Sequence, residues 1–176
     1  MGRKIFTSNK LDVRSNTINQ IVRWYFANEL QIDCSELIWS LDDQKLYIDS
    51  LLRKYPSPSI IVNSFEEKNA DGIVQDKKEI IDGIQRIYAI LSFIKNDFSI
   101  KFENYEGYFD MRVIPSMQQK SIIQKYPILP LYLCCNFADY ELPVTLISQD
   151  DDTIKEIYIR LISNKPSHLS KYLYEN

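Results

Sequence analysis

The chain has 176 residues, 45% hydrophobic and 26% charged, a composition typical of one soluble globular domain. Its 21 basic and 24 acidic residues give a net charge of −3, which excludes the strongly basic profile of a bulk nucleic-acid binder. A single histidine, His168, excludes a multi-histidine metal centre. No apolar stretch approaches the ~20 residues of a membrane span and no secretory signal begins the chain, so we expect a cytoplasmic protein.

Apolar residues at helical spacing, with polar cap residues before them, predict helices along the first half of the chain. The expected helices are Thr17–Asn28, capped by Asn16 or Thr17, then Leu41–Lys54, capped by Ser40, and Ile84–Asn96. Between the last two, strands are expected at Ser59–Asn63 and Glu79–Asp82, joined by a long charged loop, Phe65–Lys78.

The second half of the chain continues to mix strand and helix signals. The expected elements are a short helix near Ser116–Lys125, strands at Leu131–Cys135 and Pro143–Ile147, and a helix at Asp151–Ser163. Interspersed helices and hairpin-like strands favour an α+β fold over a regular doubly wound sheet. We expect residues 1–15 to be an N-terminal extension and residues 16–176 to be a single domain.

Several residue groups allow both a structural and a functional interpretation, and the structural one is favoured. Cys34, Cys134 and Cys135 lack C-x-x-C spacing and are expected to be reduced, partly buried thiols. The acidic run Asp150–Asp152 suits a helix start better than a metal site, so no metal centre is expected. The aromatic run Trp24–Phe26 is expected to pack on the core rather than to form a partner surface.

The most informative segment is the turn from an apolar strand into a helix at Asp82, Gly83, Ile84, Gln85 and Arg86. Gly83 permits a tight turn, and the helix start offers free N–H groups and a positive dipole end. A cation in the first turn, here Arg86, needs an anion nearby, either the Asp82 carboxylate or an external phosphate. Asp82 and Gln85 also match a capping box, so the spacing leaves a structural cap and an anion site both open.

This run, followed by Ile-Tyr-Ala-Ile-Leu-Ser-Phe, resembles the Asp-Gly-Gln-Gln-Arg signature of the N-terminal domain of GmrSD-type restriction systems. Further stretches of the chain resemble the family's elements in the same order, from about Asn16 to Leu169. These are Thr17–Ile21, Ile38–Gln44, Tyr47–Leu52, Tyr55–Val62, Leu142–Ile147 and Ile157–Leu161.

The resemblance implies a ParB/sulfiredoxin-like fold, a single α+β domain with a small mixed sheet flanked by helices. It also implies a nucleotide-handling role in bacterial defence against phage, with DNA cut by a separate nuclease. It implies that Asp82, Gly83, Gln85 and Arg86 bind nucleotide, with Asp82 and Arg86 catalytic if hydrolysis occurs, and that Arg160 adds charge. The cofactor would be a nucleoside triphosphate with magnesium. Cys34, Ser35, Ile84 and Ile162 stand where the family has Gln, Arg, Gln and Asn. The loss of one cation and of amide groups predicts weak or absent hydrolysis.

The leading hypothesis is therefore a nucleotide- or phosphate-binding module of a restriction system, with a separate nuclease or defence protein as a partner. The alternative is a non-catalytic interaction or regulatory module in which the Asp82–Arg86 turn is only a helix cap. A weaker third hypothesis is direct DNA binding through a local basic patch. Its residues would be Arg3, Lys4, Arg53, Lys54, Lys77 and Lys78.

Overall fold

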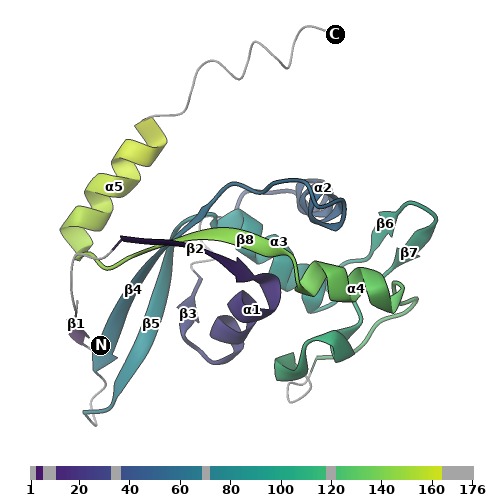
Figure 1. Ribbon diagram of the computed structural model, residues 1–176, viewed down its shortest axis with the longest axis horizontal. Helices are drawn as coiled ribbons and strands as arrows, with labels where there is room; N and C mark the ends of the chain where they lie inside the picture. Colours follow the sequence, from purple (N-terminus) through teal and green to yellow (C-terminus); the bar gives the residue numbers. More distant parts are fainter. Residues whose placement is uncertain (1–2, 6–10, 33–36, 69–71, 118–121, 164–176) are drawn as a thin grey trace, which may run out of the picture.

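A mixed β-sheet forms the centre of the protein (Figure 1). The computed structural model describes residues 3–5, 11–32, 37–68, 72–117 and 122–163. The sheet has the order β2-β8-β4-β5-β3, and β1 pairs with β4 beside this path. Its strands are β1 (Arg3–Ile5), β2 (Leu11–Thr17), β3 (Leu30–Gln31), β4 (Ile60–Lys68), β5 (Val74–Asp82) and β8 (Glu141–Ile147). The β4–β8 and β3–β5 pairs are parallel and the others antiparallel, which confirms the expected α+β class with a mixed sheet.

Helices pack on this sheet and on one another, and two of the expected caps are present. The helices are α1 (Ile18–Phe26), α2 (Leu41–Leu52), α3 (Ile84–Ile94), α4 (Leu131–Ala138) and α5 (Asp151–Ser163). Thr17 and Ser40 form complete capping boxes at the starts of α1 and α2. Two short strands, β6 (Ile100–Phe102) and β7 (Tyr105–Gly107), make a separate hairpin beside α4 in Figure 1.

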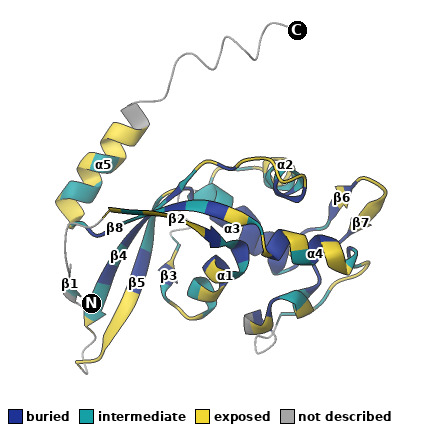
Figure 2. Cartoon of the chain, viewed as in Figure 1, coloured by how far each residue is buried: buried dark blue, intermediate teal, exposed yellow. Residues whose placement is uncertain are grey.

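The buried core includes the inner faces of α3 and α4, and Figure 2 shows α4 with alternating buried and exposed residues. Phe93 of α3 is fully buried and contacts three further rings, those of Phe98, Phe109 and Phe137, at centroid distances of 5.2–5.8 Å. By contrast, α5 extends away from the body and is largely exposed (Figure 2). The core therefore fixes the start of α3, which follows β5 directly.

Three expectations for secondary structure need correction. Leu131–Cys135, expected as a strand, is the first part of α4, because a short apolar run satisfies either period and Pro130 can precede a helix. Most of the expected loop Phe65–Lys78 is strand, since β4 and β5 continue to Lys68 and from Val74. In the expected helix Ser116–Lys125, the described residues contain only the end of a short 3-10 turn, η3 (Pro115–Met117), and residues 122–125 are not helical; residues 118–121 lie outside the described part. In addition, β1 and most of β2 come from residues 1–15.

The two cysteines that the structure describes sit on α4. Cys134 is buried, and burial raises the pKa of its thiol to about 11, so the thiol stays protonated at neutral pH. Cys135 is partly buried on the same helix. The third cysteine, Cys34, and His168 lie outside the described residues. Cys134 is thus an inert thiol of the core.

A buried carboxylate beside this core should make the stability of the protein depend on acid pH. Asp110 is 2% exposed and accepts hydrogen bonds from Arg112 Nε at 2.9 Å and Nη2 at 2.6 Å, and these bonds lower the pKa of Asp110 from its usual 3.8. Because the folded-state pKa is depressed, this stabilisation is complete above the unfolded-state pKa and is lost as the pH falls through the folded-state pKa. Asp110→Asn should cost about 2 kcal/mol at neutral pH.

The check is urea denaturation of the protein and of Asp110→Asn at neutral pH and at about pH 3. The difference between the two proteins should shrink as the pH falls. A difference in free energy of unfolding that stays constant over this range would contradict the assigned ion pair.

Candidate functional site

The turn between β5 and α3 is built on a glycine in the left-handed region. Gly83 has φ +100° and is the N-cap residue of α3, and no side chain caps this helix. A β-carbon on Gly83 would lie 2.5 Å from Ile60 Cδ1, so the backbone here passes directly against β4. The capping box of Asp82 and Gln85, one of the two alternatives that the spacing allowed, is therefore not formed. Glycine lets the chain turn sharply, which leaves the first N–H groups of α3 without a side-chain cap.

The Asp82 and Arg86 side chains form an ion pair across this turn, as one of the sequence interpretations anticipated. Arg86 Nη2 donates to Asp82 Oδ2 at 2.6 Å, and Nη1 donates to the carbonyls of Pro58 at 2.6 Å and Ser59 at 3.2 Å. The Arg86 side chain is only 12% exposed, whereas that of Asp82 is 49% exposed. Arg86 thus ties α3 to the start of β4, and Asp82 is the member of the pair that solvent or a ligand reaches.

Gln85 connects this turn to the segment before α2. Its Oε1 accepts hydrogen bonds from the backbone N–H groups of Ile38 at 3.1 Å and Trp39 at 3.2 Å. The Trp39 ring then packs edge-on against Tyr47 at a centroid distance of 5.5 Å. Gln85 therefore places an aromatic ring beside the helix start, a long-range contact that a local capping motif does not provide.

An open hollow of about 550 Å³ lies at this junction. It is lined by Ile38, Trp39, Ile81, Asp82, Gly83, Ile84, Gln85, Arg86 and Tyr158. The structure thus brings four of the five predicted binding residues together and adds two aromatic lining residues, Trp39 and Tyr158. The volume is within the ~300–1,000 Å³ usual for small-ligand sites.

The fifth predicted residue, Arg160, does not line this hollow. It lies on α5, is 73% exposed and forms an ion pair with Glu156 one turn earlier. Tyr158, two residues before it, is the α5 residue at the hollow. Of the four positions that depart from the signature, Ile84 lines the hollow, Cys34 and Ser35 lie outside the described residues, and the Ile162 side chain is also outside them.

The basic residues of the DNA-binding hypothesis are spread over β1, β5 and the region after α2. Lys4 pairs with Glu79 and Asp151, Arg53 with Asp49, and Lys78 with Glu29. Lys77 is buried and donates to the Asn28 carbonyl at 2.7 Å. The Arg3 side chain is outside the described part of the structure. Lys4, Lys77 and Lys78 thus link different elements, and the six residues do not gather on one element.

The protein is therefore an α+β domain that has an open hollow where a strand of the sheet turns into a buried helix. Polar and aromatic residues line this hollow. Comparison with family models identifies the domain further. The model described as the GmrSD restriction endonuclease, N-terminal domain, matches residues 35–169, and the chain belongs to this family. Comparisons with curated proteins and with solved structures gave no match.

Two further findings concern the described residues alone. None of their helices has the length and apolar character needed to cross a bilayer. They contain no cluster of three or more acidic, histidine or cysteine side chains arranged to hold a metal ion.

Proposed function

We propose that the protein is the ligand-sensing component of a restriction system and binds a nucleotide, or another phosphate-bearing ligand, at the Asp82 turn. The observation that carries the proposal is the hollow at the uncapped start of α3, next to two aromatic rings. Backbone N–H groups at a helix start favour phosphate, and the rings of Trp39 and Tyr158 offer apolar surface to a base.

Each residue of the turn has a distinct role in this proposal. The N–H groups that follow Gly83 receive the phosphate, and Asp82 holds a magnesium ion that arrives with the nucleotide. A single carboxylate suffices because Mg²⁺ is commonly bound by one or two carboxylates together with substrate phosphates. Arg86 and Gln85 are positioning residues, since Arg86 orients Asp82 and Gln85 fixes the backbone of Trp39.

The same geometry supports weak or absent hydrolysis. Arg86 is the one cation among the described residues that line the hollow, and its guanidinium already binds Asp82 and two carbonyls. Phosphoryl transfer depends on positive charge placed around the transferring group. With this cation engaged elsewhere, the hollow is better suited to bind a nucleotide than to hydrolyse it.

The chain offers a specific probe, because one of its two tryptophans, Trp39, lines this hollow. In a Trp24→Phe variant, Trp39 emission should change on titration with ATP or GTP in the presence of magnesium. Without magnesium the change should be weak, since Asp82 repels phosphate. Asp82→Asn in the same background should lower the affinity for the magnesium nucleotide by about tenfold.

Arg160→Gln in this background is the matched control. Arg160 is paired with Glu156 outside the hollow, so its loss should change the affinity by less than about twofold. No response of Trp39 to any nucleotide, with or without magnesium, would contradict nucleotide binding. An equal effect of Arg160→Gln and Asp82→Asn would show that general charge, and not the turn, governs binding.

The second candidate is the non-catalytic interaction module, which one feature of α5 favours. Three apolar side chains of this helix are well exposed: Tyr158 at 39%, Ile159 at 62% and Leu161 at 39%. Exposed apolar residues gathered on one element are typical of protein-binding surfaces. If all nucleotides fail in the titration above, a separate nuclease or defence protein bound at α5 becomes the leading function.

A further inference from the structure

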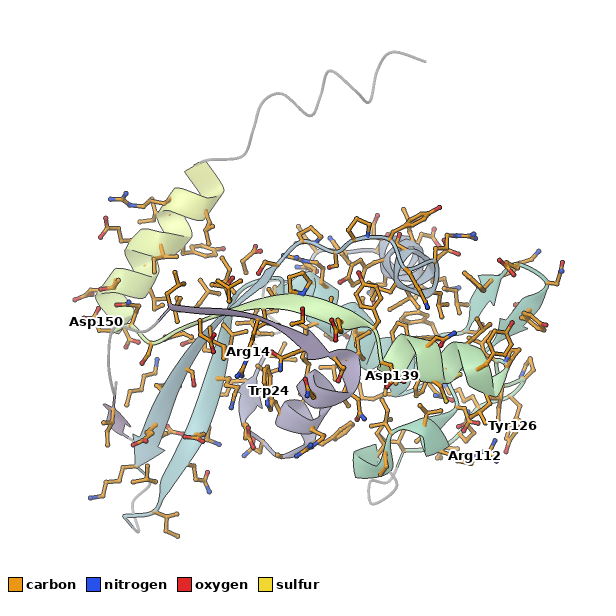
Figure 3. The ribbon with its side chains drawn as sticks, in the orientation of Figure 1. Arg14, Trp24, Arg112, Tyr126, Asp139 and Asp150 are labelled. Atoms are coloured by element: carbon orange, nitrogen blue, oxygen red, sulfur yellow. The ribbon has the colours of Figure 1, made fainter. Side chains whose placement is uncertain are left out.

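A second polar pocket of about 290 Å³ lies between β2, α1 and the residues that follow α1. It is lined by Arg14, Asn16, Gln20, Arg23, Trp24, Ala27 and Glu29. Figure 3 shows Arg14 of β2 and Trp24 of α1 close together on the same side of β2. None of these residues lines the hollow at the Asp82 turn, so the two pockets are separate.

A buried amide holds the first arginine of this pocket in place. Asn16 is 7% exposed; its Oδ1 accepts a hydrogen bond from Arg14 Nε at 3.2 Å, and its Nδ2 donates to Gln20 Oε1 at 3.1 Å. Gln20 is itself fixed by the capping box at Thr17. The remaining edge of the Arg14 guanidinium meets one carboxylate among the described residues, that of Asp12, at 3.8 Å. The guanidinium is therefore held in a fixed orientation, and its remaining N–H groups can still donate hydrogen bonds to a ligand.

The second arginine has even less to neutralise it. Within the part of the chain that the structure describes, no carboxylate lies within 4.0 Å of Arg23. The carboxylate lining the pocket, Glu29, binds Lys78 at 2.9 Å, and Lys78 Nζ also lies 5.1 Å from the centre of the Trp24 ring. Among the lining residues, two guanidinium groups thus face one carboxylate, that of Glu29, which is already paired with Lys78, so the local charge is positive although the chain is acidic overall.

We infer that this pocket binds a phosphate ester, with Arg14 and Arg23 as the residues that contact the phosphate oxygens. Guanidinium groups from two elements suit a tetrahedral anion, which offers oxygens to both, better than a planar carboxylate. The volume, slightly below the ~300 Å³ at which small-ligand pockets begin, suits one phosphate and its attached sugar but not a whole triphosphate. The ester is either a free nucleotide or the backbone of DNA, and both carry the same chemistry.

Trp24 lines this pocket while Trp39 lines the other, so each site has its own fluorophore. In Trp39→Phe, Trp24 emission should change on titration with a nucleoside monophosphate or with a short DNA duplex, and not with acetate at equal ionic strength. Arg23→Gln should weaken binding by about tenfold, and the affinity of the unmodified pocket should fall as salt is raised. Arg23→Lys keeps the positive charge but loses the paired N–H donors of the guanidinium, so it should weaken binding less than Arg23→Gln.

Lys101→Gln on β6 is the matched control because it removes one exposed positive charge away from the pocket. It should leave the affinity unchanged. Arg23 is exposed in the last turn of α1, so Arg23→Gln should remain folded, which circular dichroism checks.

The monophosphate and the duplex also show whether the phosphate ester comes from a free nucleotide or from DNA. Binding of the monophosphate alone assigns a free nucleotide, and binding of the duplex alone assigns the DNA backbone; either result supports the pocket. An unchanged Trp24 signal with both probes would overturn the inference, as would equal binding of acetate or equal affinities of Arg23→Gln and Lys101→Gln. Because Trp24 is the only tryptophan left in this assay and the variants change Arg23 and Lys101, the results report the second pocket and not the Asp82 turn.

Discussion

Replacing Arg86 by alanine should lower the free energy of unfolding by about 3 kcal/mol. The Arg86 side chain is 12% exposed, and its guanidinium donates hydrogen bonds to Asp82 and to the carbonyls of Pro58 and Ser59. Alanine leaves both carbonyls without this donor and removes the link between α3 and the start of β4. The half-exposed Asp82 can be rehydrated, so the main loss comes from the carbonyls. Urea denaturation at neutral pH measures the difference.

Arg160→Ala is the matched control for this prediction. Arg160 also pairs with an acid one helical turn earlier, but both partners are more than half exposed, so its loss should cost about 0.5 kcal/mol or less. Arg86→Lys should lie between the two, since one ammonium group cannot reach all three acceptors of the guanidinium. Equal losses for Arg86→Ala and Arg160→Ala would show that Arg86 is only a surface ion pair.

The sequence predicted those parts of the fold that local rules determine. Thr17 and Ser40 begin α1 and α2 because each cap is satisfied within four residues. The run Leu131–Cys135 could not be assigned in the same way, because five apolar residues fit a strand or a helix and only their burial against the aromatic core decides. The charged ends of β4 and β5 were predicted as a loop because charged residues are usually exposed. Lys77 can be buried in β5 only because its ammonium group binds a distant acceptor, the Asn28 carbonyl.

In the candidate site, too, contacts between neighbouring residues could be predicted from the sequence and contacts between distant residues could not. Its location at Gly83 and the Asp82–Arg86 pair could be inferred from adjacent residues. The role of Gln85 could not, because its oxygen binds the backbone at Ile38 and Trp39, more than 40 residues earlier. Arg14 and Arg23 were not singled out since they come from a strand and a helix that meet only in the fold. Their one sequence signal is a pair of arginines on either side of a capping box.

Gly83→Ala should destabilise the protein by about 2–3 kcal/mol. Part of the loss is backbone strain, because φ +100° lies in the left-handed region, which residues with a β-carbon rarely adopt. The rest is steric: the new β-carbon would lie 2.5 Å from Cδ1 and 3.3 Å from Cγ2 of Ile60, which is 1% exposed and packed in the core. Relief requires the buried Ile60 side chain to repack or α3 to shift away from β4, and a shift of α3 should weaken nucleotide binding reported by Trp39 as well.

Gly72→Ala separates strain from contact, because Gly72 also has a positive φ, +82°, but its added β-carbon would come no closer than 3.7 Å to Lys68 Cε. This variant should lose about 1 kcal/mol and keep its nucleotide affinity. The two variants should be compared by urea denaturation and by Trp39 titration in the Trp24→Phe background. If they lose equal stability, the packing of Gly83 on Ile60 contributes nothing. If Gly83→Ala loses stability but binds nucleotide as before, the ligand does not bind at the start of α3.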